Sequence, residues 1–296
     1  MQNKTYLKIF KFFAVSLVFA CSMSAFAMEN GNSSYPNGSE DFLAKLNDEG
    51  LNIINYLSYR HNTDSYDNSG NKKDMKFDSK AIVDTFRIIY NTGLKPFGGS
   101  LGVHMLIPVV DLELKTPGGN DDASGVADVV IGVNEAFHSK NRHIIVGIDV
   151  TTPTGDYNKN DIANLGKNHY TIEPYALTHY ITDTGFEIGA KFMYDYNTEN
   201  NDTDYKSGQE FHIDYIMGQH FGPYNVGLGG YLYKQITDDK QNGSEIEDYR
   251  AQAAGIGPVF KYDYKSASFT VKYVKDFAVE NTSGGDQYWF KINYAF

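Results

Sequence analysis

Apolar and polar side chains alternate along most of the chain beyond residue 50. The clearest stretch runs from residue 186 to residue 196. One of its faces carries Phe186, Ile188, Ala190, Phe192, Tyr194 and Tyr196. The positions between them hold Glu187, Gly189, Lys191, Met193 and Asp195. Because successive side chains of a β-strand point to opposite faces, this period of two predicts a strand with one apolar face and one charged face.

About twelve segments repeat this pattern, each close to the roughly 9–11 residues that a tilted strand needs to cross a bilayer. They begin near Leu51, Lys80, Ser100, Gly125, Arg142, Tyr170, Gly185, Gly208, Asn225, Tyr249, Ala267 and Asp286. The connections between them alternate in length. Long polar stretches cover residues 62–79, 116–124, 153–168, 197–207, 238–248 and 280–285. Short turns cover residues 91–98, 138–141, 182–184, 222–224 and 263–266.

This organisation predicts an all-β fold over residues 51–296, a transmembrane antiparallel up-and-down β-barrel of about twelve strands. Long loops on one side and short turns on the other are typical of bacterial outer-membrane barrels, with long extracellular loops and short periplasmic turns. The barrel must close, because an unpaired sheet edge in hydrocarbon costs several kcal/mol per polar group. An even strand number predicts that both termini face the periplasm.

Residues 1–27 are predicted to be a signal peptide. Lys4, Lys8 and Lys11 form a basic start, an apolar run follows at residues 12–21, and the A-x-A motif of residues 25–27 predicts cleavage before Met28. Lipidation of Cys21 is the less favoured alternative, because a bulky Phe19 stands where a small residue is expected.

Residues 28–50 are predicted to be a periplasmic N-terminal linker. Residues 28–38 are rich in Gly, Asn, Ser and Pro, as flexible linkers are. Ser39 is a candidate cap for a short helix reaching Asn47, with Phe42, Leu43 and Leu46 on one face. Such a helix could be periplasmic or part of a plug. An ordered lead-in to the first strand is the favoured alternative.

Composition and charge support an exported membrane protein. Beyond residue 21 no apolar run approaches the ~20 residues of a spanning helix, so a membrane would be crossed by strands. Cys21 is the single cysteine and lies in the predicted leader, so disulfides are not expected. The net charge of −11 argues against a nucleic-acid partner. Acidic loops of this kind could bridge lipopolysaccharide through divalent cations, in addition to contacts of the barrel with outer-membrane lipid.

Alternation assigns a set of ionisable residues to the barrel lumen, where they would tune what passes. Two functions remain open for them: paired charges that pack a narrow barrel, or a selectivity field along a water-filled path. The candidates are Glu173, His179, Glu187, Lys191, Asp195, Glu210, His212, Asp214, Lys272 and Lys291.

Catalytic and metal sites are not predicted. His138-Ser139 falls in a short turn, without the context of a base and its orienting partner, and His212 and Asp214 lie in mid-strand rather than at a rim. The eight histidines show no recurring ligand spacing. No enzyme activity, cofactor or metal is therefore expected.

One stretch resembles a known family. Residues 153–157, read as Pro153, Thr154, Gly155, Asp156 and Tyr157, precede a segment that contains Asn164 and Gly166. Together they resemble a signature of the outer-membrane family named for the meta-pathway of phenol degradation. The resemblance implies a transporter-like barrel that imports small, often hydrophobic or aromatic compounds. The terminal Phe296, after alternating aromatics, resembles the signal that the barrel-assembly machinery reads.

The predicted function is therefore an outer-membrane channel for passive uptake of small hydrophobic or aromatic compounds. The alternative is a structural or adhesive surface barrel that acts through its extracellular loops, and an outer-membrane hydrolase is less favoured. No nucleotide-binding motif accompanies the barrel, so diffusion down a gradient is the expected mechanism. Sustained conductance would favour the channel, whereas a closed barrel with ligand-binding loops would favour the alternative.

Overall fold

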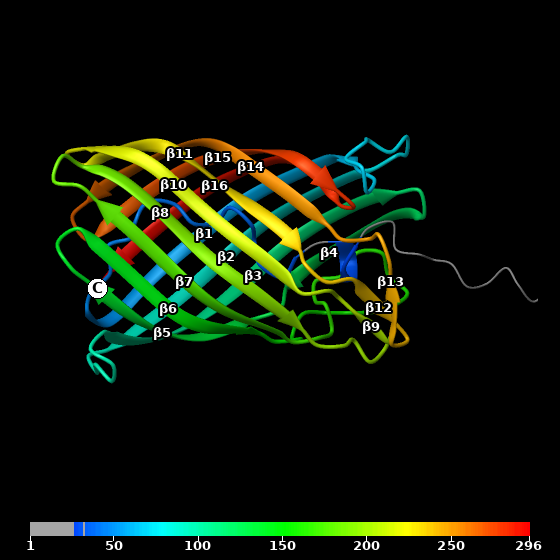
Figure 1. Ribbon diagram of the computed structural model, residues 1–296, viewed down its shortest axis with the longest axis horizontal. Coiled ribbons are helices and arrows are strands. Elements are labelled where there is room, and N and C mark those ends of the chain that lie inside the picture. The colour runs from blue at the N-terminus through cyan, green and yellow to red at the C-terminus, as the bar shows by residue number, and fades with distance from the viewer. Residues whose placement is uncertain (1–26, 32) are drawn as a thin grey trace, which may run out of the picture.

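The computed structural model describes residues 27–31 and 33–296, and it confirms a closed antiparallel barrel of twelve strands (Figure 1). Each strand pairs with its neighbours in the chain, and β1 pairs with β16 to join the first strand to the last. The barrel strands are β1 (Glu49–Ser65), β2 (Asp78–Thr92), β3 (Ser100–Thr116), β5 (Val130–His138), β6 (Arg142–Thr151), β7 (Thr171–Ile181), β8 (Phe186–Asn197), β10 (Glu210–Phe221), β11 (Tyr224–Gln235), β14 (Gln252–Tyr264), β15 (Ala267–Glu280) and β16 (Ser283–Ala295).

The two faces of the barrel wall differ as the alternation predicts. On β8, Ile188 points outward and is 49 % exposed, whereas its neighbour Glu187 points inward and is fully buried. The same inversion recurs on β7 and β10, where apolar side chains are exposed and charged ones are enclosed. A band of exposed apolar side chains around a polar interior suits a lipid environment. No helix in residues 27–31 and 33–296 combines the length and apolar character needed to cross a membrane.

Three of the expected long loops, at residues 116–124, 197–207 and 238–248, contain strands. The predicted loop at residues 116–124 is the tip of a β-hairpin, because β4 (Gly119–Val126) pairs back onto β3. The next barrel strand therefore begins at Val130 rather than near Gly125. Residues 238–248 hold β12 (Asp239–Gln241) and β13 (Ser244–Ile246), which join β9 (Tyr205–Lys206) in a small sheet at the long-loop end. Backbone pairing overrides the loop-like composition of these three segments.

The predicted connection at residues 280–285 is not a long loop. Only residues 281 and 282 separate β15 from β16, and Asn281 has a positive φ of 50° that suits a tight turn. The last strand thus begins at Ser283, three residues before the expected Asp286.

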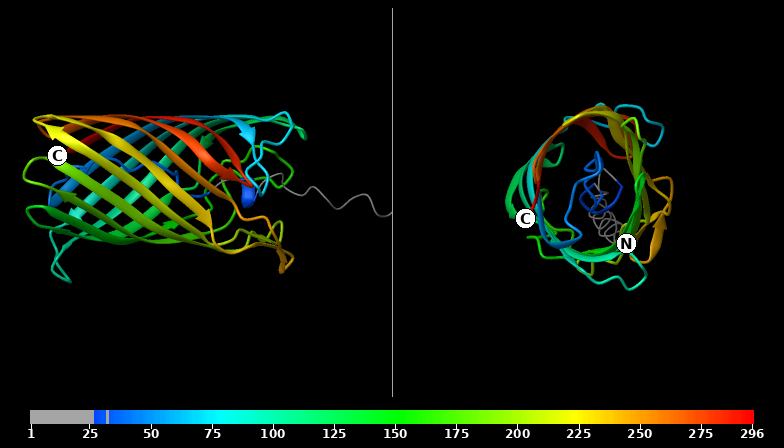
Figure 2. Two further views of the ribbon diagram at one scale, coloured as in Figure 1. Left: turned by 45° about the horizontal axis from the view of Figure 1, so that its top comes forward. Right: turned by 90° about the vertical axis from the view of Figure 1, so that its left-hand side faces the viewer.

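The N-terminal segment, described for residues 27–31 and 33–48, runs through the inside of the barrel, which corrects the predicted periplasmic linker. Figure 2 shows it within the ring of strands, and Figure 1 shows it entering at the long-loop end and the C-terminus at the other. The Ala27 amide donates to the Asn281 carbonyl at the long-loop end, while the Asn47 side chain donates to the Phe296 carbonyl at the short-turn end. The described chain therefore begins and ends at opposite mouths, and the prediction that both termini share one side is wrong.

The predicted helix from Ser39 to Asn47 does not form. Among residues 27–31 and 33–48, the one helical turn is η1 (Glu29–Gly31). Backbone groups that a helix would pair internally are bonded to the wall: the Glu40 amide donates to Asp214 at 3.0 Å, and the Leu43 amide donates to Glu187 at 2.8 Å. Because these lumen side chains satisfy the backbone, the segment remains extended.

Candidate functional site

The middle of the N-terminal segment is held by one carboxylate and one lysine of the wall. Asp214 on β10 accepts from the Gly38 amide at 2.8 Å and from the Tyr35 hydroxyl at 3.0 Å, in addition to the Glu40 amide. Lys272 on β15 donates to the carbonyls of Gly38 and Glu40 at 2.8 and 2.7 Å. The two side chains thus take up the polar groups of the same short stretch of backbone.

Phe42 is the main apolar anchor of the segment. Its side chain is 1 % exposed and packs with Ile216 and Val259 in a small cluster on the wall. The ring fits a hollow that glycine creates on β10, because a Cβ atom added to Gly218 would lie 2.5 Å from the Phe42 Cζ atom. The absence of a side chain at Gly218 is therefore required for the segment to dock here.

All ten ionisable residues assigned to the lumen are buried in the structure, and they gather into groups with the segment. Lys191 forms an ion pair with Glu173 at 3.2 Å, and its ammonium lies 4.5 Å from the ring centre of Tyr175. Lys291 pairs with Asp41 of the segment at 3.1 Å. Charges of both signs are thus compensated in the enclosed interior.

Histidines compensate the remaining acids. Glu187 lies 2.5 Å from His179 and 2.5 Å from His220. His212 lies 3.2 Å from Asp195 and 3.4 Å from Glu210, all three fully buried. Their functional roles as selectivity residues remain predictions.

Several other lumen residues were not predicted from the sequence. They include the ion pair of His104 and Asp149 at 2.9 Å, and Lys261, which donates to the Leu43 carbonyl at 2.7 Å. Arg87 also faces the interior, between the outward-facing Phe86 and Ile88. The same alternation could have identified Arg87, because its neighbours are both large and apolar.

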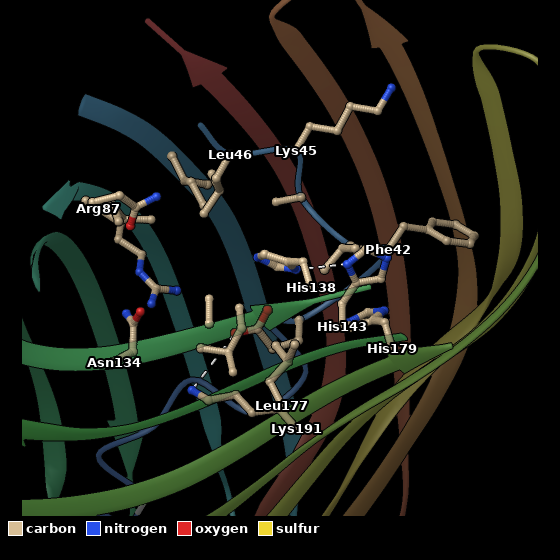
Figure 3. Close-up of a pocket in the computed structure, with 18 of the residues that line it drawn as sticks. Phe42, Lys45, Leu46, Arg87, Asn134, His138, His143, Leu177, His179 and Lys191 are labelled. Atoms are coloured by element: carbon tan, nitrogen blue, oxygen red, sulfur yellow. Dashed lines mark hydrogen bonds and ion pairs between the residues drawn. The ribbon is translucent and has the colours of Figure 1, made fainter. Parts of the chain in front are cut away.

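A cavity of about 280 Å³ remains between the segment and the wall near the short-turn end (Figure 3). Its apolar part is formed by Leu43, Leu46, Ile54, Ile89, Ile145 and Leu177. Polar groups also line it, including Arg87, Asn134, His138, His143, His179 and Lys191. An engineered cavity of about 150 Å³ is known to hold benzene, so this space is large enough for one small aromatic molecule.

The stretch that carries the family resemblance forms a compact loop at the opposite mouth. Asp128, between β4 and β5, folds it by accepting from the amides of Gly155 and Lys167, both at 2.9 Å. A Cβ atom on Gly166 would lie 2.6 Å from the Gly155 carbonyl oxygen, so the two halves of the loop approach each other where neither has a side chain.

The other residues of this stretch make local contacts. The Thr154 hydroxyl accepts from the Val129 amide at 2.9 Å, and the Asp156 carbonyl accepts from the Gly166 amide at 3.0 Å. The Asn164 side chain accepts from the amide of Asn158 at 2.7 Å, whereas Pro153 simply precedes the crossing.

The same loop touches the N-terminal segment. The Tyr157 hydroxyl donates to Glu29 at 3.0 Å, and Asn200 donates to the same oxygen at 2.9 Å. Burial raises the pKa of Glu29. The loop that carries the family resemblance therefore forms part of the binding surface for the first described residues of the N-terminal segment.

We expect this loop to loosen in acid because of His169. Burial, with the nearby Lys167 charge, lowers the pKa of His169 to about 4. An opened loop would bind the proton with a pKa near 6.5, so acidification from pH 6.5 towards 4 favours opening, by up to about 3 kcal/mol. The protection factors of residues 153–170 against hydrogen exchange, which are corrected for the intrinsic pH dependence of exchange, should therefore fall below pH 6.5.

His169→Asn is the matched control for this prediction, since an amide does not titrate. The pH dependence attributed to His169 should disappear in that variant, once intrinsic exchange rates are corrected. Equal pH dependence in both proteins would contradict the assignment.

Asp195, Glu210 and His212 are a group of three whose ligand atoms lie within 4.8 Å of one another. The His212 Nδ1 atom faces the Asn37 side-chain oxygen at 2.6 Å, which leaves Nε2 directed at the two carboxylates. An imidazolium between two carboxylates satisfies this arrangement. The same donor types also bind divalent cations.

The residues considered for hydrolysis do not form a catalytic arrangement. His138 faces His143 at 2.9 Å between their Nδ1 atoms, and the Ser139 hydroxyl donates to the Arg142 carbonyl. His212 and Asp214 are both engaged with the N-terminal segment. Neither pair supplies a nucleophile with its base.

Comparisons with known proteins agree with this architecture. The family model described as the putative MetA-pathway of phenol degradation matches residues 63–292. The COG4313 outer membrane channel from Pseudomonas putida F1 superposes with a TM-score of 0.75 at 17 % identity, covering 85 % of this chain and 97 % of that one. No curated protein matches the chain significantly in sequence.

Two autotransporter domains share the barrel more distantly. The NalP translocator domain from Neisseria meningitidis has a TM-score of 0.51 at 10 % identity, covering 84 % of this chain and 90 % of that one. The β domain of the Bordetella autotransporter BrkA has a TM-score of 0.50 at 9 % identity, covering 84 % and 100 %. These likenesses establish the fold of a bacterial outer-membrane barrel.

Proposed function

This chain belongs to the family of the putative MetA-pathway of phenol degradation, and from that membership we propose that it is an outer-membrane channel for passive uptake of small hydrophobic or aromatic compounds. The observation that carries the proposal is the partly apolar cavity inside a closed barrel, next to a segment that fills the rest of the lumen. A pocket lined by apolar side chains with a few polar groups suits such a solute.

In this proposal the N-terminal segment is the movable part. Many of its contacts are hydrogen bonds to carboxylates and lysines of the wall, which water can replace at modest cost. A solute would enter through the outer loops, bind transiently beside the displaced segment, and leave down its gradient at the short-turn mouth. No energy source is needed for this sequence of steps.

The exposed surface of the barrel supports a location in the outer membrane. The exposed apolar band favours contact with outer-membrane lipid, and the acidic loops are suited to lipopolysaccharide bridged by divalent cations. Phe296, exposed at the short-turn mouth, remains our candidate signal for the barrel-assembly machinery.

Filling the cavity should reduce uptake. Leu177 lines it from β7, and Leu177→Trp would occupy space that a small aromatic solute needs. We expect uptake of labelled phenol or benzoate by porin-deficient cells to fall roughly tenfold, equivalent to about 1.4 kcal/mol. Initial rates at equal surface expression are the measurement.

Ile188→Trp is the matched control, because it places the same ring on the lipid-facing side of the neighbouring strand. Uptake should then equal that of the unaltered protein. Equal rates for aromatic solutes and sugars would refute the substrate class. Rates no higher than in cells without the protein would refute the channel and favour an adhesive surface barrel.

A further inference from the structure

Asp239 on β12 is a fully buried carboxylate at the long-loop mouth. Its Oδ2 atom accepts from the Met28 backbone nitrogen at 2.8 Å and from the Tyr205 hydroxyl at 2.6 Å. Its Oδ1 atom accepts from the Gly208 amide at 2.7 Å and from the Gln235 side chain at 2.8 Å. Every one of these four donors is neutral.

This situation differs from that of two other buried acids in the lumen. Asp41 and Glu173 each have a lysine within ion-pair distance, Lys291 and Lys191 respectively. Within residues 27–31 and 33–296, no ion pair of Asp239 is found, and burial raises the pKa of this carboxyl. A buried carboxylate without a cation is costly, so a positive charge delivered to this position would stabilise it.

The sequence supplies such a charge at the right atom. The A-x-A motif that ends at Ala27 predicts cleavage of the Ala27–Met28 peptide bond. Hydrolysis of that bond consumes one water and leaves a carboxylate on Ala27 and an α-ammonium group on Met28. The nitrogen that carries the new charge is the one that already lies 2.8 Å from Asp239.

We infer that Asp239 is the receptor for the processed amino terminus, and that leader removal replaces the neutral amide donor at this carboxylate with an ammonium, which forms a buried ion pair at the outer mouth. An ammonium has three N–H donors and is a recognised partner of such enclosed sites. The inference rests on the proposed function in one respect: the segment that the pair of Met28 and Asp239 would hold is the movable part of the proposed channel.

The surroundings form a built site for the first processed residue. The Met28 side chain is buried in a cluster with Tyr231, Tyr233 and Val274, and the Tyr233 hydroxyl points at its sulfur atom at 2.7 Å. The next residue is fixed as well, because the Glu29 amide donates to the Ser207 hydroxyl at 3.0 Å. Side chain, backbone and amino group are thus each recognised.

The test uses the full chain, exported and purified from membranes in detergent. Mass spectrometry should first find Met28 as the first residue. An amine-reactive reagent at pH 7 then reports whether the α-amino group is accessible, since lysines are protonated at that pH. In the folded protein we expect Met28 to react at least tenfold more slowly than in the urea-unfolded chain.

Asp239→Asn should remove most of this protection, and Asp238→Asn is its matched control. Asp238 pairs with Arg250 on the surface at 2.7 Å, so its substitution should leave the labelling rate unchanged. A folded Asp239→Asn protein labelled as slowly as the unaltered chain would overturn the inference. If this variant does not form a barrel, the unaltered protein decides: rapid labelling, or a first residue other than Met28, overturns it. None of these results depends on whether the barrel conducts.

Discussion

Deleting residues 28–47 while retaining residues 1–27 is expected to raise the single-channel conductance severalfold. The barrel should still close, because its twelve strands pair with one another and none of them lies in the deleted range. The lumen charges that the segment had covered would become hydrated, and water would occupy the former path of the segment. Planar bilayer recordings of the deleted and full-length proteins provide the measurement.

The deletion should also shift ion selectivity towards anions. It removes Glu40 and Asp41, which lie near Lys191 and pair with Lys291 respectively, while both lysines stay on the wall. Reversal potentials in a salt gradient would report the shift, and it should shrink as ionic strength rises. A folded deletion variant that conducts no better than the full-length protein would contradict the view that the segment obstructs the lumen.

Phe42→Ala is expected to have the largest effect of any single substitution in the segment. Truncation of a buried phenylalanine costs about 3–5 kcal/mol, and here the loss falls on docking of the segment rather than on the strands. Amides of Gly38, Glu40 and Leu43 should consequently exchange with solvent about a hundredfold faster or more. Hydrogen exchange with mass spectrometry of the purified protein can follow this stretch.

Lys45→Ala is the control within the same segment. The Lys45 side chain is exposed and points away from the cavity in Figure 3, while its carbonyl accepts from Asn293 and would continue to do so. Exchange in this variant should match the unaltered protein. Equal exchange in the Phe42→Ala and Lys45→Ala proteins would show that the aromatic ring does not anchor the segment.

The barrel wall was predictable from the chain because its rule is local. The alternation at residues 186–196 predicts β8 almost to its observed bounds, Phe186–Asn197. The hairpin at β4 escaped because Gly119, Asn120 and Asp121 have loop composition, yet their backbones pair with β3. Propensity is a weak guide where an adjacent strand offers a complete row of partners.

The path of the N-terminal segment could not be derived in this way. Gly38 bonds to Asp214, which lies 176 residues further along, and Leu43 bonds to Glu187, 144 residues away. Both acids were assigned to the lumen by alternation, but nothing local indicates that a backbone would satisfy them. The cavity beside the segment was equally out of reach, since its shape depends on where that backbone lies.

Because the N-terminal segment lies inside a closed barrel, the order in which the protein can assemble is restricted. The ladder between β1 and β16 leaves no lateral seam, so the segment must either be wrapped as the ring forms or be inserted axially afterwards, free end first. If the segment is inserted axially, an uncleaved leader of residues 1–27 would have to pass through the whole length of the barrel ahead of Met28. Maturation would then proceed in a fixed sequence, with proteolysis first, ring closure next and insertion last.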